Sequence, residues 1–382
     1  MNGVVNTDPQ TEEAALETDI ILPPGTDIAE THPDLVGVVE EDENEESSSY
    51  WDASSMAPLN AVSAAAIARL RAYKPPPFPL WDRLHLSRRA AVLLLLFADR
   101  RGDLRVVITM RAASLRSFSG HAAFPGGKAD TTDETPYQIA RREAWEEIGL
   151  PMDDTKIPSP FRIEHLCYLP MNLARTELIV RPCVAFLHVT QPPVPIDSTI
   201  ATPPPNKPTA TKVEDNLIPR LDAKEVAAVF SAPFHNFLLA TDEIPQKKGK
   251  WYEGNWIHWH AHPWRVHYFG VPITDQRVVK PIGAEKKKDD ELAENGRYKV
   301  WGMTARILVD AATIAYGKAP EFEHNSHFGD EEIILELDRM GQLGPKVRSG
   351  QAADAAAAAA AAVDVKRATD EVKTTSDEAS KM

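Results

Sequence analysis

Apolar and polar positions divide the chain into a patterned middle and two unpatterned ends. The first 55 residues lack apolar periodicity and contain the acidic run Glu40–Glu46, and low hydrophobicity with charge of one sign is typical of disorder. The far end carries an alanine run followed by polar sequence, which favours a tail. We therefore expect an acidic, mostly disordered extension over 1–75, a folded domain over 76–325 and a C-terminal tail over 326–382.

Apolar runs of strand length mark the first half of the folded domain. Arg89–Ala98 is continuously apolar and Leu104–Met110 follows it after a polar turn, so these two runs predict a β-hairpin. Arg162–Pro170 and Glu177–Val189 predict further strands. Alternation over Trp256–Gly270 predicts another.

Three segments have helical periodicity: Ala61–Ala72, Pro136–Ile148 and Trp301–Tyr316. The middle helix has clear boundary signals. Thr135 suits the N-cap, Pro136 the first helical position, and Gly149 the left-handed position after the last turn.

Three other segments interrupt this pattern. The stretch 191–211 is Pro-rich and predicts a surface insertion. The stretch 285–296 is charged and predicts a loop. Between them, Ala223–Ala240 combines features of a loop and a short helix.

The charge balance excludes one class of partner. Residues 1–50 contain 14 acids and no Lys or Arg, whereas the whole chain has 56 acids and 42 Lys and Arg, so the remainder is neutral. We expect no nucleic-acid partner, because such binding needs a basic face. Cys167 and Cys183 are too few for a disulfide framework and are expected as reduced core thiols. No apolar run approaches the roughly 20 residues of a membrane span.

The middle helix carries candidate chemistry. On a helical wheel Tyr137, Ala140, Ala144 and Ile148 form the apolar stripe, which faces a core. Glu143, Glu146 and Glu147 form the adjacent stripe, and a like-charged pair at i,i+4 is unfavourable unless something offsets it. Clustered carboxylates suit hard cations such as Mg²⁺ or Mn²⁺, which also bind phosphates. A solvated acidic face is the alternative for such a stripe.

The surroundings of this stripe match a known pattern. Gly127 through Leu150 resembles the Nudix box, G-x5-E-x7-R-E-U-x-E-E-x-G-U, with Glu134 and Arg142 at the correct separation. One extra residue lies between Gly127 and Glu134, and Ala144 is small for its position. The resemblance implies an α/β/α sandwich with a mixed β-sheet and hydrolysis of a nucleoside diphosphate derivative.

The family pattern also implies roles for individual residues. Glu143, Glu146 and Glu147 are implied to bind the cations, and Glu134 to orient Arg142. Glu225 is the candidate general base, since Nudix enzymes often place an acid in a comparable late loop. Its alternative is an ordinary surface glutamate.

A second motif narrows the substrate. Residues Ile108–Ala112, Arg116 and Phe124–Gly127 are similar to the signature of the coenzyme A diphosphatase subgroup, in which the extra loop residue also recurs. Trp301–Arg306 resembles that subgroup's late W-G-x-T-A helix. These resemblances imply cleavage of coenzyme A or acyl-CoA to 3′,5′-ADP and 4′-phosphopantetheine or its acylated form. The alternatives are another nucleoside diphosphate derivative, such as ADP-ribose, NADH or capped RNA, and a non-catalytic Nudix-fold binding protein.

Several residues near the motifs have two interpretations. Arg111 and Arg116 either pair with substrate phosphates, because guanidinium forks match phosphate oxygens, or tie down the loop. Gly126 and Gly127 allow close approach of backbone to a ligand. His121 beside the glycine loop either contacts substrate or makes a structural hydrogen bond.

Two weaker signals remain. His258, His260 and His262 alternate, so a zinc site is conceivable, but their tryptophan neighbours favour an aromatic strand edge or substrate wall. The chain ends Ser380-Lys381-Met382, which resembles the S-K-L type of peroxisomal address. We expect a peroxisomal protein that binds the import receptor through this tripeptide, and otherwise a cytoplasmic one.

Overall fold

The computed structural model describes residues 56–345 except 113, 116–119, 190–220, 223, 243–248, 274–275, 277 and 281–295. All of these residues belong to one compact unit, Glu45–Met382. Four expectations lie outside the described residues: the disordered start of the extension, the Pro-rich insertion, nearly all of the charged loop, and the alanine run with the terminal tripeptide.

An eight-stranded mixed sheet forms the centre of the fold, in the order β3-β2-β1-β7-β5. The neighbours β1 and β7 run parallel, whereas β2 pairs antiparallel with β1. Three strands lie off this path: β4 pairs with β1, β6 with β7, and β8 with β2. The strands are β1 (Arg89–Ala98), β2 (Leu104–Arg111), β3 (Ala122–Ala123), β4 (Gly126–Lys128), β5 (Phe161–Tyr168), β6 (Asn172–Leu173), β7 (Ile179–Val189) and β8 (Val226–Pro233).

Helices and a second sheet surround this centre. The second sheet has the order β11-β10-β9. Its strands are β9 (Tyr252–Trp259), β10 (His262–Pro272) and β11 (Arg297–Trp301), and the α-helices are α1 (Ala61–Ala72), α2 (Pro136–Ile148), α5 (Gly302–Tyr316) and α6 (Glu331–Arg339). Short 3-10 turns are η2 (Trp81–Arg83), η3 (Leu86–Arg88), η4 (Asp154–Lys156) and η5 (His235–Leu238).

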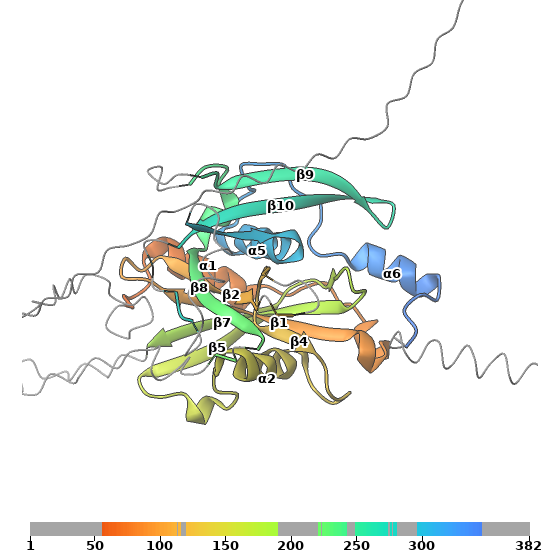
Figure 1. Cartoon of the computed structure of the whole chain (residues 1–382), viewed down its shortest axis with the longest axis horizontal. Helices are drawn as coiled ribbons and strands as arrows, with labels where there is room; N and C mark the ends of the chain where they lie inside the picture. The colour runs from red at the N-terminus through yellow and green to blue at the C-terminus, as the bar shows by residue number, and fades with distance from the viewer. Residues whose placement is uncertain are drawn as a thin grey trace, which may run out of the picture. The chain divides into compact units, whose positions relative to one another are not determined.

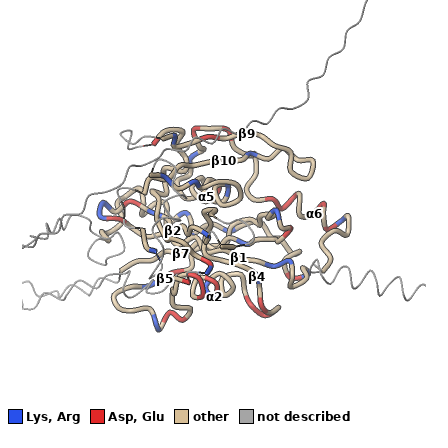
Figure 2. The backbone as a smooth tube through the Cα atoms, viewed as in Figure 1, with Lys and Arg blue, Asp and Glu red and all other residues tan. Residues whose placement is uncertain are grey.

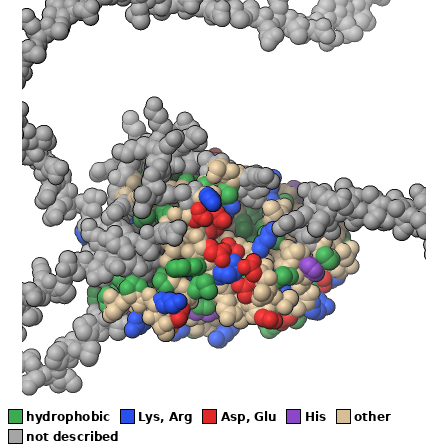
Figure 3. Space-filling model, turned by 60° about the horizontal axis from the view of Figure 1, so that its bottom comes forward, with side chains coloured by type: hydrophobic (Ala, Val, Ile, Leu, Met, Phe, Trp, Pro, Cys, Tyr) green, Lys and Arg blue, Asp and Glu red, His purple; other side chains and the backbone are tan. Residues whose placement is uncertain are grey.

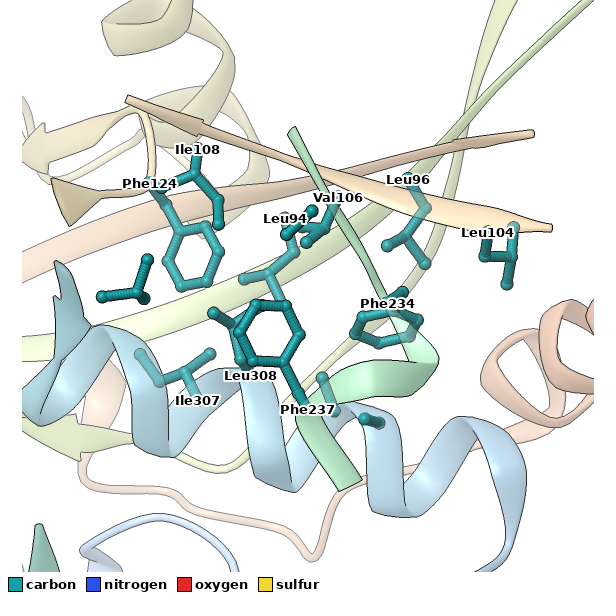
Figure 4. Close-up of a cluster of buried hydrophobic side chains, with 14 of the residues drawn as sticks. Leu94, Leu96, Leu104, Val106, Ile108, Phe124, Phe234, Phe237, Ile307 and Leu308 are labelled. Atoms are coloured by element: carbon teal, nitrogen blue, oxygen red, sulfur yellow. The ribbon is translucent and has the colours of Figure 1, made fainter. Parts of the chain in front are cut away.

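The central sheet separates two apolar cores. Leu93 and Leu95 of β1 pack with the buried face of α2, and the alternating Leu94 and Leu96 pack with α5 on the opposite side, because successive strand side chains point to opposite faces. Figure 1 shows α2 on one side of the sheet and α1 and α5 on the other. Figure 4 shows the α5-side core, where Leu308 lies beneath β1 and β2. The predicted α/β/α sandwich with a mixed sheet is therefore confirmed.

The second sheet adds a layer that the sequence did not predict. Strand β10 contacts α5, and Figure 1 shows β9 and β10 beyond that helix. The single strand expected over Trp256–Gly270 was wrong, because the chain turns at His260 and Ala261, whose φ angles are 47° and 65°. Neither is a usual residue for a turn with positive φ, so the alternation appears unbroken in sequence.

Strand β8 is likewise a correction, and strand β11 begins where no element was predicted. β8 lies where a loop and a short helix were expected. Its sequence, VAAVFSAP, is rich in alanine and buried over seven of its eight residues, so it has neither strong β-propensity nor a polar face. Strand β11 is short and begins directly after the charged loop.

Two helices with buried residues lie outside the range 76–325. Helix α1, which matches its predicted bounds, packs against α5 and buries Ile67 and Leu70. Helix α6 lies within the region expected as a tail, and Ile333, Ile334 and Leu337 are buried. Packed helices therefore lie on both sides of the range 76–325, whose boundaries stay a prediction.

Candidate active site

Helix α2 is held in place by the local signals that predicted it. The Thr135 side chain accepts a hydrogen bond from the Gln138 amide, and the Gln138 side-chain oxygen accepts one from the Thr135 amide, so a capping box starts the helix. Gly149 ends it in the left-handed region, with φ of 74°. Ile139 and Ala144 are fully buried, which fixes the helix against β1 and turns its acidic stripe toward the glycine loop.

The three predicted acids of α2 range from buried to exposed. Glu147 is 4% exposed, whereas the side chains of Glu143 and Glu146 are 15% and 52% exposed. Figure 2 shows acidic and basic residues together on α2 and acidic residues in the loop before it. In Figure 3, which turns the α2 side toward the viewer, Asp and Glu side chains gather with Lys and Arg at the middle of the face.

The glycine loop lies directly against these carboxylates. The Gly126 amide donates to Glu147 Oε2 at 3.3 Å. A Cβ on Gly127 would lie 2.5 Å from the Glu143 carboxylate, and one on Gly126, whose φ is 155°, would lie 2.4 Å from the Ala91 carbonyl oxygen. A side chain at Gly126 would therefore collide with the backbone of β1, and one at Gly127 would displace the Glu143 carboxylate.

Arg142 joins the loop to the helix. Its Nε donates to Glu134 Oε1 at 2.8 Å, and its Nη2 donates to the Lys128 carbonyl at 2.7 Å. Its Nη1 reaches Glu143 at 3.1 Å and Glu146 at 3.4 Å. The predicted pairing of Glu134 with Arg142 is present. Although partial burial opposes the effect, hydrogen bonds from Arg142 and from two loop amides hold the pKa of Glu134 below its ordinary value.

The buried carboxylates crowd negative charge into a small region. Burial raises the pKa of Glu147 to about 8, the charge of Arg111 opposes this, and the carboxylates of Glu143 and Glu225 add to it. Burial also raises the pKa of Glu143, with Arg142 opposing the shift. Desolvation and like charge both disfavour the ionised forms, so a cation beside these groups would stabilise them.

The donor chemistry of this region fits a hard divalent cation. Within the described part of the chain, no three His, Cys, Asp or Glu side chains already converge as metal ligands. Instead, the Arg142 guanidinium contacts Glu143 and Glu146. The carboxylates of Glu143 and Glu147, which repel each other and have raised pKa values, are the groups whose surroundings best fit such an ion.

Glu225 approaches this region from another element. It lies immediately before β8, and its carbonyl accepts from the Ala112 amide at 2.9 Å. Its neighbour Asp222 donates its amide to the Glu147 carbonyl at 3.0 Å. The charge of Glu225 is close enough to raise the pKa of both Glu143 and Glu147. The structure thus brings together a late-loop acid and the α2 acids.

Of the two predicted phosphate-binding arginines, the structure describes one. Arg111 ends β2, and its charge opposes the rise that burial causes in the pKa of Glu147. Its buried Nε has no hydrogen-bond partner among the described residues. Arg116 lies outside the described residues.

Two cations near Arg111 were missed by sequence reasoning. Arg175 and Lys299 both lower the pKa of His121, after burial and Arg111. They are isolated in the sequence, and the signal that points to Lys299 is its position two residues before Trp301, where the late motif begins.

The alternating histidines do not share one strand face. His258 lies on β9, His260 in the turn, and His262 on β10, where its Nε2 lies 2.9 Å from Glu336. Their placement on one strand was therefore wrong. Cys167 and Cys183 are buried and free. No helix among the described residues has the length and apolar character to cross a bilayer.

Comparison with known proteins agrees with this geometry. A family model described as the NUDIX domain matches residues 87–176. The Saccharomyces cerevisiae protein named peroxisomal coenzyme A diphosphatase 1 is 30% identical over 287 residues, which cover 69% of this chain and 79% of that protein. The Arabidopsis thaliana protein named Nudix hydrolase 22, chloroplastic, is 30% identical over 62% of this chain and 58% of that protein.

A mouse relative extends the comparison. A Mus musculus protein named as a peroxisomal coenzyme A diphosphatase is 26% identical over 239 residues, which cover 63% of this chain and 75% of that protein. The family match covers strands β1 to β6, the glycine loop and α2. The predicted family is therefore confirmed, and this chain belongs to the Nudix hydrolases.

Proposed function

We propose that this protein is a metal-dependent pyrophosphohydrolase that cleaves the diphosphate of coenzyme A or acyl-CoA. The products are 3′,5′-ADP and 4′-phosphopantetheine or its acylated form. The names of the yeast and mouse relatives support this substrate, as does the subgroup signature around Arg111 and Phe124–Gly127. The observation that carries the proposal is the buried, mutually repelling pair Glu143 and Glu147 behind a glycine loop.

Nudix hydrolases generally use divalent metal cations. Here Glu143, Glu146 and Glu147 are the proposed ligands, and the ion is Mg²⁺ or Mn²⁺. When bound, such an ion supplies Lewis acidity and lowers the pKa of a water molecule.

Residues of the chain itself position the metal ligands and accept the proton. Arg142, anchored by Glu134 and the Lys128 carbonyl, fixes the direction in which Glu143 and Glu146 point. Glu225 accepts the proton of the attacking water as general base. Its carboxylate is exposed and is within electrostatic range of Glu143.

Substrate phosphates are proposed to lie between the glycine loop and the arginines. Gly126 and Gly127 leave room there, and Arg111 and Arg116 pair with the diphosphate oxygens. The buried Nε of Arg111 has no hydrogen-bond partner among the described residues. The unpaired donor also weakens the alternative that Arg111 only ties down the loop.

The direct test is product analysis. Purified protein is incubated with coenzyme A and with ADP-ribose, NADH and capped RNA, each with Mg²⁺ or Mn²⁺. We expect release of 3′,5′-ADP from coenzyme A at the highest kcat/KM, and none after chelation. Efficient cleavage of another substrate without 3′,5′-ADP release would exclude the coenzyme A assignment. Absence of turnover on every substrate would favour a binding protein.

We also propose that the protein is peroxisomal. Ser380-Lys381-Met382 would bind the import receptor, but it lies outside the described residues. The yeast and mouse relatives carry peroxisomal names, and a plant relative carries a chloroplastic one. An N-terminally tagged full chain should localise to peroxisomes, and removal of the tripeptide should leave it cytosolic. Unchanged peroxisomal signal after removal would refute this address.

A further inference from the structure

A second group of charged side chains lies beside the proposed catalytic carboxylates. Arg111, whose charge acts on Glu147, donates its amide to the His121 carbonyl at 3.0 Å. The ring of His121 lies 4.9 Å from that of Trp301. This series of contacts leads from α2 across the end of β2 to strand β11 and the start of α5.

Lys299 is positioned on this path by aromatic rings. It lies two residues before Trp301, so both side chains project from the same face of β11. Tyr268 on β10 is the ladder partner of Trp301, and these two rings are stacked with centroids 5.8 Å apart and planes inclined by 10°. The Lys299 ammonium lies 4.9 Å from the Tyr268 ring centroid, a cation–π distance.

Positive charge accumulates here. Burial lowers the pKa of His121, and the charges of Arg111, Arg175 and Lys299 lower it further. The charges of three permanent cations therefore act on one imidazole. Lys299 is exposed, and no acid among the described residues forms a salt bridge with it.

The first turn of α5 adds to the positive electrostatic potential near Lys299. Its N-cap, Trp301, has no side-chain hydrogen bond to the helix, and no acid lies in the first turn. A Cβ on Gly302 would meet no other described residue within 4 Å, so the described part of the chain leaves space at the start of the helix. Free amides at a helix start carry partial positive charge, and together with the cations they favour a multiply charged anion.

We propose that Lys299, with His121 and Arg175, binds the ribose phosphate of the substrate and thereby selects a 3′-phosphorylated adenosine diphosphate ester. This inference rests on the proposed function and deepens it. Arg111 lies at the junction, with the carboxylates of α2 on one side and the Lys299 group on the other. The diphosphate would lie on the first side and the ribose phosphate on the second. Lysine suits this role because it binds phosphate as a point charge.

The test compares coenzyme A with dephospho-coenzyme A, which lacks only the ribose phosphate. Values of kcat/KM are measured for both substrates in the full-length wild type, in Lys299→Gln, and in the control Lys250→Gln. Lys250 is an exposed lysine of the same outer region that pairs with Glu253 at 3.5 Å. We expect Lys299→Gln to lower kcat/KM for coenzyme A by about tenfold or more, the scale of one lost charge-assisted hydrogen bond.

The control substrate and control variant define the other outcomes. With dephospho-coenzyme A, Lys299→Gln should match the wild type, and Lys250→Gln should match it on both substrates. Equal losses on both substrates, or no loss, would overturn the inference while leaving the proposed function intact. Hydrolysis of neither substrate by wild type would remove both.

A binding measurement on the wild type gives an independent readout. Inhibition by 3′,5′-ADP is compared with inhibition by 5′-AMP, which lacks the ribose phosphate. The inhibition constant of 3′,5′-ADP should be at least about tenfold lower than that of 5′-AMP. In Lys299→Gln the two inhibition constants should be similar. Equal inhibition of the wild type by both nucleotides would contradict the assignment even if Lys299→Gln fails to fold.

Discussion

Helix α2 and the outer layer of β9, β10 and β11 differ in the sequence distance of the contacts that define them. Helix α2 is delimited by its own capping residues and carries its acids on one stripe. The outer layer instead depends on partners distant in sequence. For example, the ladder joins Tyr268 to Trp301. The comparison teaches that local chemistry defines the proposed catalytic helix, whereas the region proposed to select substrate exists only after folding.

The largest expected effect is that of replacing Asp330, which connects the outer layer to the central sheet. This fully buried residue accepts from the Leu173 amide at 3.0 Å and from Trp264 Nε1 at 2.9 Å, and it pairs with buried Arg306 at 3.4 Å. Removing one member of a buried pair leaves the other charge uncompensated. Asp330→Ala should therefore lower the free energy of unfolding by about 3–5 kcal/mol, measured by urea denaturation.

An exposed ion pair provides the matched control. Asp338 pairs with Arg83 at 3.3 Å, and their side chains are 36% and 68% exposed. Such surface pairs contribute about 0–1 kcal/mol, so Asp338→Ala should unfold near the wild-type urea concentration. If Asp330→Ala unfolded there too, the buried network would not hold the outer layer to the central sheet.

Glu143→Gln tests the proposed metal site on helix α2. It removes a proposed cation ligand and also one of two repelling buried carboxylates. Mutation of residues that only hydrogen-bond to metal ligands lowers metal affinity or activity by about 10–100-fold. Loss of a ligand itself should therefore lower kcat by about a hundredfold or more. The melting temperature should stay near that of the wild type, because reduced repulsion offsets the lost contact with Arg142.

The matched control here is Glu332→Gln, an exposed acid of α6, which should keep wild-type turnover. Calorimetric titration with Mn²⁺ supplies a second readout, and Glu143→Gln should bind the ion more weakly. Wild-type kcat in the Glu143 variant would remove this residue from the proposed metal site.

The features predicted correctly are those set by residues close in sequence, and the features missed depend on distant residues. The bounds of α2, the strand Arg89–Ala98 and the contact of Glu134 with Arg142 were all predicted, because each depends on residues close in sequence. Strand β8 was missed because its alanines carry weak propensity and both of its faces are buried. The turn at His260 was missed because its positive φ is imposed by the fold rather than by residue type.

The candidate site divides in the same way. The three α2 acids share one helix stripe, so a wheel was enough to group them. Glu225 needed the family pattern, because it reaches the α2 acids only through the packing of β8 beside β2. The one local signal for Lys299 is its position two residues before Trp301, since its neighbours His121 and Arg175 are more than 100 positions away.

A buried histidine network gives the last and smallest test. Tyr252 Oη lies 3.1 Å from His267 Nδ1, His267 Nε2 lies 2.9 Å from His324 Nδ1, and His324 contacts Asp310 at 2.7 Å. Burial, with the nearby charges of His324, Arg265 and Arg306, lowers the pKa of His267 to about 2. The outer layer is therefore built around an imidazole that stays neutral.

The sign of the pH dependence follows from proton linkage. An unfolded histidine has a pKa of about 6.5, so below that pH the unfolded state binds a proton that folded His267 does not. Stability should be fully present above pH 6.5 and fall by about 1.4 kcal/mol per pH unit below it, toward pH 2. Urea denaturation at pH 7.5, 6.5 and 5.5 measures this loss. In His267→Gln, which does not titrate, the loss between pH 6.5 and 5.5 should be smaller by about 1 kcal/mol, because the unfolded histidine is already half protonated at pH 6.5. An unchanged loss would mean that His267 is protonated in the folded protein.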